Sequence, residues 1–177
     1  MKTFMQEKAI LGILEGMAQS LQTDFSEKKQ PPLMIGIHTG GVWLAEHLHK
    51  MMALPDALGL LDASLYRDDL QRSGINTNAK PTHLPFNIDD RDLILVDDVL
   101  QTGRTIRAAI NGLFDYGRPA SIKLLELVVR KGREIPIQAD YIGFNPSLRK
   151  QDRIVLNGPN PLVLTLVTND QPKRENQ

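Results

Sequence analysis

Apolar side chains recur along the chain with a period that alternates between helical and strand-like. The positions from Phe4 to Leu21 have helical spacing, which predicts an amphipathic helix. Short, continuous apolar runs such as Leu93–Val96 are typical of strands buried on both faces of a parallel sheet. In chain order, we expect helix 3–22, strand 33–37, helix 42–52, strand 58–65, strand 93–96, helix 104–116, strand 122–129, and shorter strands at 139–143, 153–156 and 162–167.

The alternation of strands and helices predicts an α/β fold with a central parallel sheet flanked by helices. Ligands of such sheets bind outside the carboxyl ends of the strands. Residues 66–92 interrupt the pattern, because they are polar, lack a clear period and contain Gly74 and Pro81. Loops of this length within a compact domain are often functional, so we expect a flexible active-site loop here. The polar tail at 168–177 is expected to be loose.

Length, charge and cysteine content limit the classes of protein to which this chain can belong. The chain has 177 residues, 21 of them Lys or Arg and 21 Asp or Glu, so its formal net charge is zero. This length predicts one domain over residues 1–177, and the charge balance lacks the long-range field of a strong nucleic-acid binder. The absence of cysteine excludes disulfides and thiolate chemistry. No apolar run is long enough to cross a membrane and no signal peptide is evident, so a cytoplasmic protein is expected.

One segment, LILVDDVLQTGRT at 93–105, combines an apolar strand, two acidic residues and the start of a helix. A helix N-terminus offers free N–H groups and partial positive charge, and Gly103 allows close approach of a phosphate. Carboxylates at Asp97 and Asp98 can accept hydrogen bonds from ribose hydroxyls, so the segment predicts a ribose 5-phosphate site. The spacing matches neither the P-loop nor the dinucleotide fingerprint. The alternative is a capped helix after a buried strand, with two surface aspartates.

The same segment resembles the phosphoribosyl-diphosphate (PRPP) motif of type I phosphoribosyltransferases. The resemblance to the PyrR family of uracil phosphoribosyltransferases extends from about residue 5 to residue 157. It includes SLYRDDL at 64–70, VDDVLQTGRTIRAAI at 96–110 and REIPIQADYIG at 133–143. It implies a parallel sheet with a small hood over the active site, and a reaction in which uracil and PRPP give UMP and pyrophosphate with Mg²⁺. Some family members also bind messenger RNA.

The resemblance assigns roles to individual positions. Asp97 and Asp98 would hold the ribose, and the loop at 66–82 would cover bound PRPP. Arg67 is the loop cation expected to act in catalysis, and a surface ion pair with a neighbouring aspartate is the alternative. The residues implied in binding PRPP and its 5-phosphate are Val99, Leu100, Gln101, Thr102, Gly103, Arg104 and Thr105.

Two regions depart from the family pattern. The turn implied to bind pyrophosphate, Thr39, Gly40 and Gly41, has glycine where the family normally carries Arg or Lys. Such a loss is expected to slow turnover, and Gly40→Arg would then restore it. In the base region, formed by Val129, Arg130 and Arg133, valine replaces the usual Asp, so its side chain cannot hydrogen-bond a base.

Two functions remain open at the level of sequence. The first is an enzyme that makes UMP. The second is a weak or inactive regulator of pyrimidine genes that senses PRPP or nucleotide. The implied partners are PRPP, uracil, UMP and UTP, with Mg²⁺ held by protein carboxylates or by PRPP itself. RNA binding is not expected, since the stretch ILEGMAQS at 13–20 carries no cation. A homodimer or higher homo-oligomer is expected from the family.

Overall fold

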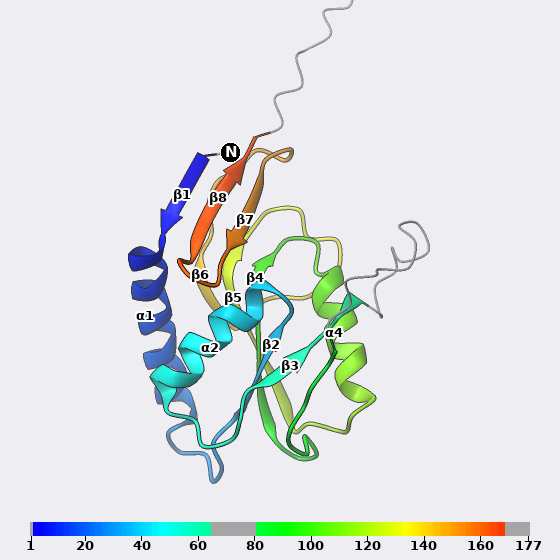
Figure 1. Cartoon of the computed structure of the whole chain (residues 1–177). Helices are drawn as coiled ribbons and strands as arrows, with labels where there is room; N and C mark the ends of the chain where they lie inside the picture. The colour runs from blue at the N-terminus through cyan, green and yellow to red at the C-terminus, as the bar shows by residue number, and fades with distance from the viewer. Residues whose placement is uncertain (1, 65–80, 169–177) are drawn as a thin grey trace, which may run out of the picture.

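The computed structural model describes residues 2–64 and 81–168, and its centre is a parallel sheet (Figure 1). The sheet has five strands in the order β3–β2–β4–β5–β6, and every neighbouring pair is parallel. These strands are β2 (Leu33–Ile37), β3 (Gly59–Leu61), β4 (Asp92–Leu100), β5 (Ser121–Val129) and β6 (Tyr141–Phe144). The middle of each long central strand, at 93–96 in β4 and 124–128 in β5, is buried and, apart from Glu126, apolar, because helices cover both faces of the sheet.

Helices α1 (Glu7–Phe25) and α2 (Gly40–Met52) cover one face, and α4 (Arg104–Phe114) covers the other. On the α1–α2 side, Ile10 and Leu44 pack with Ile94 of β4. On the α4 side, Ile106 and Leu95 belong to a second buried cluster. The expected fold class is therefore confirmed.

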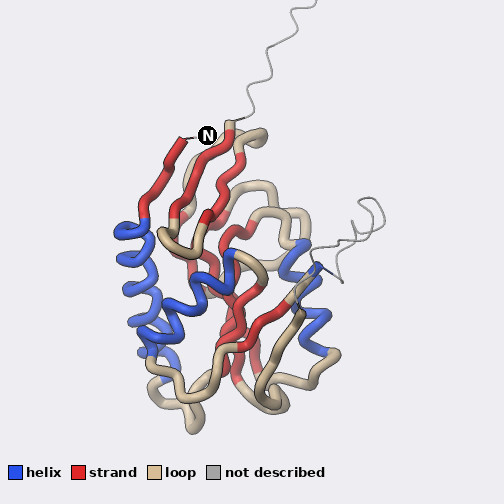
Figure 2. The backbone as a smooth tube through the Cα atoms, in the orientation of Figure 1, coloured by secondary structure: helices blue, strands red, loops and turns tan. Residues whose placement is uncertain are grey.

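A smaller antiparallel sheet joins the two ends of the described chain. It has the order β1–β8–β7 and contains β1 (Lys2–Gln6), β7 (Arg153–Asn157) and β8 (Val163–Val167). It lies beyond the carboxyl ends of the parallel strands, at the top of Figures 1 and 2. The backbone N–H of Leu162 donates a hydrogen bond to Glu7 Oε1 at 3.0 Å and links this sheet to α1. This is the place where the sequence resemblance implies a hood.

The first helix differs from its prediction. Residues 2–6 form strand β1, and α1 begins only at Glu7 and continues to Phe25. The helical spacing of Phe4 is overridden by pairing with β8, in which Lys2 lies opposite Leu166. The Phe4 ring instead stacks on Phe144, with ring centroids 5.9 Å apart. Long-range strand pairing therefore decides the conformation of this segment.

Two strands also end at other residues than predicted. Strand β4 continues to Leu100, because its ladder with β5 extends to the pair Leu100–Val129. The two aspartates of the candidate site therefore lie within the strand rather than after it. Strand β3 is shorter than the apolar run at 58–65 and contains only Gly59–Leu61.

The described part of the long polar segment packs against the sheet. His83 forms an isolated antiparallel bridge with Leu60, and the Ile88 side chain is buried in the core. The Thr82 hydroxyl accepts a hydrogen bond from the Asp62 N–H at 3.0 Å. Residues 66–80, including Arg67, and the predicted loose tail beyond Thr168 lie outside the described residues.

Candidate functional site

The adjacent aspartates near the end of β4 lie side by side, and their side chains are within hydrogen-bonding reach of each other. Asp97 is opposite Glu126 in the ladder and lies on the α4 face, where its side chain is buried. The Asp98 side chain lies on the α2 face, directly below Gly40. Burial raises the pKa of Asp98, and a side-chain hydrogen bond with Asp97 partly offsets this rise. Asp97 lines the cavity between β4 and α4, and Asp98 contacts the turn that begins α2.

The connection from β4 to α4 forms a small cavity of about 190 Å³. Its shape depends on Gly103, whose φ of 87° lies in the left-handed region that favours glycine. The Thr102 carbonyl accepts hydrogen bonds from the backbone N–H groups of Glu134 and Ile135 at 3.0 and 3.1 Å, which holds the turn in place. The residues that line the cavity are Asp97, Val99, Leu100, Gln101, Thr102, Gly103, Thr105 and Ile106.

The amino terminus of α4 adjoins this connection, and its partial positive charge attracts an anion. The helix has no acidic residue in its first turn, and the Thr102 hydroxyl accepts a hydrogen bond from the Arg104 N–H at 3.3 Å. The N–H groups of the next residues in the first turn are available to a phosphate. Arg104 is directed elsewhere, because its Nε donates to Glu134 Oε2 at 2.8 Å and it does not line the cavity. Backbone N–H groups and the threonine hydroxyls remain the donors at this end of the helix.

We expect Gly103→Ala to destabilise the protein by about 1–3 kcal/mol, because a Cβ in the left-handed conformation is strained. Chemical denaturation measures this change. The matched control is Gly12→Ala in the middle of α1, where an added Cβ meets nothing within 4 Å. That control should stabilise the protein by about 0.5–1 kcal/mol. Equal effects of the two substitutions would contradict the role given to the backbone at Gly103.

The turn between β2 and α2 approaches β4 from the other face. Residues His38 and Thr39 are joined by a cis peptide bond, and both Gly40 and Gly41 are buried. A Cβ at Gly40 would lie 2.6 Å from Asp98 Cγ, and one at Gly41 would lie 2.3 Å from the Val96 carbonyl oxygen. Glycine is therefore required at position 41, where the contacts are backbone atoms, whereas a side chain at position 40 requires Asp98 to move. An arginine at Gly40 would displace Asp98 as well as add a cation, and the rise in turnover expected of Gly40→Arg stays a prediction.

The expected base region forms a second cavity of about 370 Å³ next to the first. Gln101 lines both, and its Oε1 accepts a hydrogen bond from Arg130 Nη1 at 3.2 Å. Val129 and Arg133, two residues of the expected base region, also line this cavity. Among the described residues its walls contain cations and amides but no carboxylate. Its volume and its mixture of apolar and polar walls suit a small ligand.

Sequence reasoning missed Glu126, a wholly buried acidic residue beside Asp97. Burial raises its pKa well above the ordinary value, and the charges of Asp97 and Asp98 raise it further. Burial and the neighbouring charges therefore both favour the neutral acid form of Glu126. The sequence contains a signal for it, because a single acidic residue interrupts the apolar run LLELVV at 124–129.

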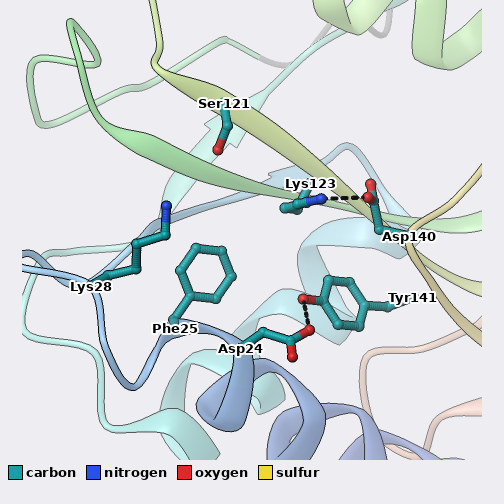
Figure 3. Close-up of a pocket in the computed structure, with 7 residues that line it drawn as sticks. All are labelled: Asp24, Phe25, Lys28, Ser121, Lys123, Asp140 and Tyr141. Atoms are coloured by element: carbon teal, nitrogen blue, oxygen red, sulfur yellow. Dashed lines mark hydrogen bonds and ion pairs between the residues drawn. The ribbon is translucent and has the colours of Figure 1, made fainter.

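A larger cavity of about 460 Å³ lies at the opposite end of the sheet (Figure 3). Its polar groups bind one another: the Tyr141 hydroxyl donates to Asp24 Oδ2 at 2.6 Å, and Lys123 Nζ lies 2.8 Å from Asp140 Oδ1. Burial and the Asp24 carboxylate raise the pKa of Tyr141. These contacts connect α1 to β5 and β6. This cavity contains none of the residues predicted to bind PRPP.

Comparison with known proteins settles the family. The sequence profile of the phosphoribosyl transferase domain matches residues 2–156. The chain belongs to the phosphoribosyltransferase family. The PRPP motif on which the resemblance was based is therefore part of a phosphoribosyltransferase domain, and that prediction is confirmed.

Within the family, the relatives are of the PyrR type. A bifunctional protein PyrR from Nitrosococcus oceani is 48% identical over 157 residues, which cover 87% of this chain and 89% of that protein. The bifunctional protein PyrR of Pseudomonas paraeruginosa is 49% identical over 153 residues, or 86% of this chain and 90% of that protein. These identities confirm that this phosphoribosyltransferase is a PyrR-type protein.

Solved structures support the fold. A hypoxanthine-guanine phosphoribosyltransferase from Bacillus anthracis superposes with a TM-score of 0.67 at 21% identity, covering 83% of this chain and 84% of that one. The hypoxanthine phosphoribosyltransferase of Trypanosoma cruzi gives 0.65 at 20% identity, with 82% of both chains covered. At this identity the likeness concerns the fold alone. In addition, no helix among the described residues of this phosphoribosyltransferase has the length and apolar character of a membrane span.

Proposed function

We propose that this PyrR-type phosphoribosyltransferase converts uracil and PRPP to UMP and pyrophosphate. The observation that carries the proposal is the cavity of about 190 Å³ between the end of β4 and the amino terminus of α4, with Asp97 in its wall. In the reaction the bond from ribose C1 to the diphosphate oxygen breaks, the bond from C1 to uracil N1 forms, and the N1 proton is released.

Each part of the site has a distinct task in this proposal. The N–H groups and hydroxyls of Thr102–Thr105 bind the 5-phosphate, and Asp97 accepts hydrogen bonds from the ribose hydroxyls. The turn Thr39–Gly41 lies on the other side of β4 and receives the diphosphate, with Asp98 below it. Catalysis then consists mainly of holding C1 and N1 in line and stabilising the charges that develop as C1–O breaks.

The base is proposed to bind in the cavity of about 370 Å³. The Val129 side chain has no hydrogen-bonding group, so recognition of uracil must come from backbone groups and from neighbours such as Gln101. Leu100 and Ile137 supply apolar surface for the faces of a planar ring. Cavities that bind small ligands commonly have apolar walls with a few polar groups.

Magnesium is proposed to enter with PRPP rather than to occupy a site made by the protein. Among the described residues no cluster of three or more His, Asp or Glu side chains has a geometry suited to a metal ion. Mg²⁺ readily binds through phosphate oxygens and water, so the diphosphate of PRPP can supply its ligands. When bound, the ion would neutralise charge on the leaving diphosphate.

A second candidate is a protein that binds PRPP or nucleotide without efficient turnover. Two observations favour it: the diphosphate turn has no cationic side chain at Gly40, and Val129 gives the base no polar side chain. A lost contact to developing charge lowers a rate by about 10²–10³. This candidate differs from the first in turnover and not in binding.

The two candidates are distinguished by assaying UMP formation from uracil, PRPP and Mg²⁺ together with PRPP binding. We expect turnover by the native protein and a loss of about 10²-fold or more in kcat/KM for Asp97→Asn, because a ribose-binding charge is removed. Glu46→Gln, on the exposed side of α2, is the control and should match the native protein. PRPP binding without turnover would support the second candidate, and absence of both would contradict the proposed function.

A further inference from the structure

Glu126 is a buried acidic side chain without a hydrogen-bond partner in the interior of the described structure. It lies in the middle of β5 with none of its surface exposed. Neither of its carboxyl oxygens has a hydrogen-bond partner among the described residues. Buried polar groups almost always have such a partner, and a buried ionised carboxylate without one is very unfavourable. The presence of a carboxyl group at this position therefore needs a physical explanation.

Its position relates it directly to the ribose phosphate site. Glu126 and Asp97 are partners in the parallel ladder of β5 and β4, so their side chains leave the sheet on the same face. Asp97 lines the cavity proposed for the ribose phosphate, and Glu126 lies beside it within the sheet. The two carboxyl groups are therefore neighbours, with one in the wall of the site and the other behind it.

The charged groups around Glu126 are known from each neighbouring element. Strand β4 contributes Asp97 and Asp98, and both disfavour ionisation of Glu126. Strand β6 places Ile142, which is uncharged, opposite Glu126. Helix α4 carries Arg104 and Arg107 over this face, but neither is among the groups that shift the pKa of Glu126. Burial and the two aspartates therefore act in the same direction.

We propose that Glu126 is a positioning residue of the ribose phosphate site, in which it acts through Asp97 by remaining a neutral carboxylic acid beside it. This inference rests on the proposed function, in which Asp97 binds the ribose. A neutral Glu126 leaves Asp97 as the carboxylate in the cavity wall that faces the ribose hydroxyls. An ionised Glu126 would add a second negative charge beside the position of the anionic 5-phosphate and would weaken binding.

The proposal predicts that PRPP binding depends on the protonation of Glu126. PRPP affinity is measured by calorimetry from about pH 6.5 to about pH 9.5 for the native protein, Glu126→Gln and Glu46→Gln. Near pH 6.5 the three proteins should agree within about twofold, because glutamine is also neutral and has a similar volume. At the alkaline end the native protein and Glu46→Gln should have lost about tenfold more affinity than Glu126→Gln.

A second measurement makes the test independent of the variant's folding. The side-chain carboxyl carbon of Glu126 is followed by NMR in the native protein, with its signal assigned by its absence in Glu126→Gln or in Glu126→Leu. We expect the chemical shift of a neutral acid at pH 6.5. A carboxylate shift at that pH would overturn the proposal.

The outcomes separate this inference from the function on which it rests. If PRPP binds and the affinities of native protein and Glu126→Gln decline equally with pH, the role of Glu126 is refuted and the proposed function stands. If PRPP binds to none of the three proteins at any pH, the proposed function fails and the inference fails with it.

Discussion

Replacing Gly40 with alanine is expected to weaken PRPP binding by about tenfold to a hundredfold while leaving the fold nearly intact. An alanine Cβ would lie 2.6 Å from Asp98 Cγ and 2.7 Å from Asp98 Oδ2. The Asp98 side chain must therefore turn away from its present position below the diphosphate turn. A factor of ten to a hundred corresponds to about 1.4–2.8 kcal/mol of binding energy. Titration with PRPP measures the effect directly.

Gly41→Ala is the matched control for this prediction. A Cβ at Gly41 would lie 2.3 Å from the Val96 carbonyl oxygen and 2.9 Å from Asp97 Cα, which are backbone atoms of the central strand. These atoms cannot rotate away, so we expect a loss of about 3 kcal/mol in the free energy of unfolding. If Gly40→Ala bound PRPP as tightly as the native protein, the coupling between this turn and Asp98 would be refuted.

The Glu126→Gln substitution is expected to stabilise the protein progressively as the pH rises. The folded-state pKa of Glu126 lies well above the ordinary 4.5, so between these two values the folded state binds more protons than the unfolded state. The native protein therefore loses stability with increasing pH in this window, by up to about 1.4 kcal/mol per pH unit. Glutamine does not titrate and avoids this loss.

Denaturant unfolding of both proteins at a series of pH values measures the difference in their free energies of unfolding. Well below pH 4.5 the difference should be a constant that reflects the exchange of acid for amide, and above that pH it should grow in favour of glutamine up to the folded-state pKa. The exposed Glu46→Gln control should show no such growth. A difference that does not change between pH 5 and pH 7 would mean that Glu126 is ionised in the folded protein.

The parts of the site that are continuous in the chain were predictable from the sequence. The segment at 93–105 indicated a strand, a turn and a helix, and these are β4 and α4. The apolar run at 33–37 predicted β2 with its bounds, because a parallel strand buried on both faces has a distinctive composition. Such features depend on local sequence, which is fully visible in the chain itself.

Features that depend on distant segments were not predictable in the same way. The helical spacing of Phe4 gave no indication that β8, some 160 residues away, would pair with this segment. The position of Asp97 and Asp98 within a strand, rather than after it, follows only once β4 is known to pair with β5 as far as Leu100. The contact between Gly40 and Asp98 joins residues from different elements, and no spacing in the sequence reveals it.

Glu126 is a different case, because its sequence signal was present. An isolated acidic residue within LLELVV has to be buried if the strand is central, and the run itself predicts a central strand. What the sequence lacked was the register that places Glu126 beside Asp97. The pairing of β5 with β4 therefore shows that this buried acid adjoins the candidate site, which is the basis of the hypothesis for Glu126.

The most direct test of the central claim is a crystal structure of the protein with bound UMP. The account predicts that the phosphate lies in the cavity between β4 and α4, with oxygens within hydrogen-bonding distance of the backbone N–H groups at 102–105. It also predicts that the ribose hydroxyls face Asp97 and that the base enters the cavity lined by Val129. A UMP phosphate bound elsewhere on the protein, with this cavity unfilled, would contradict it.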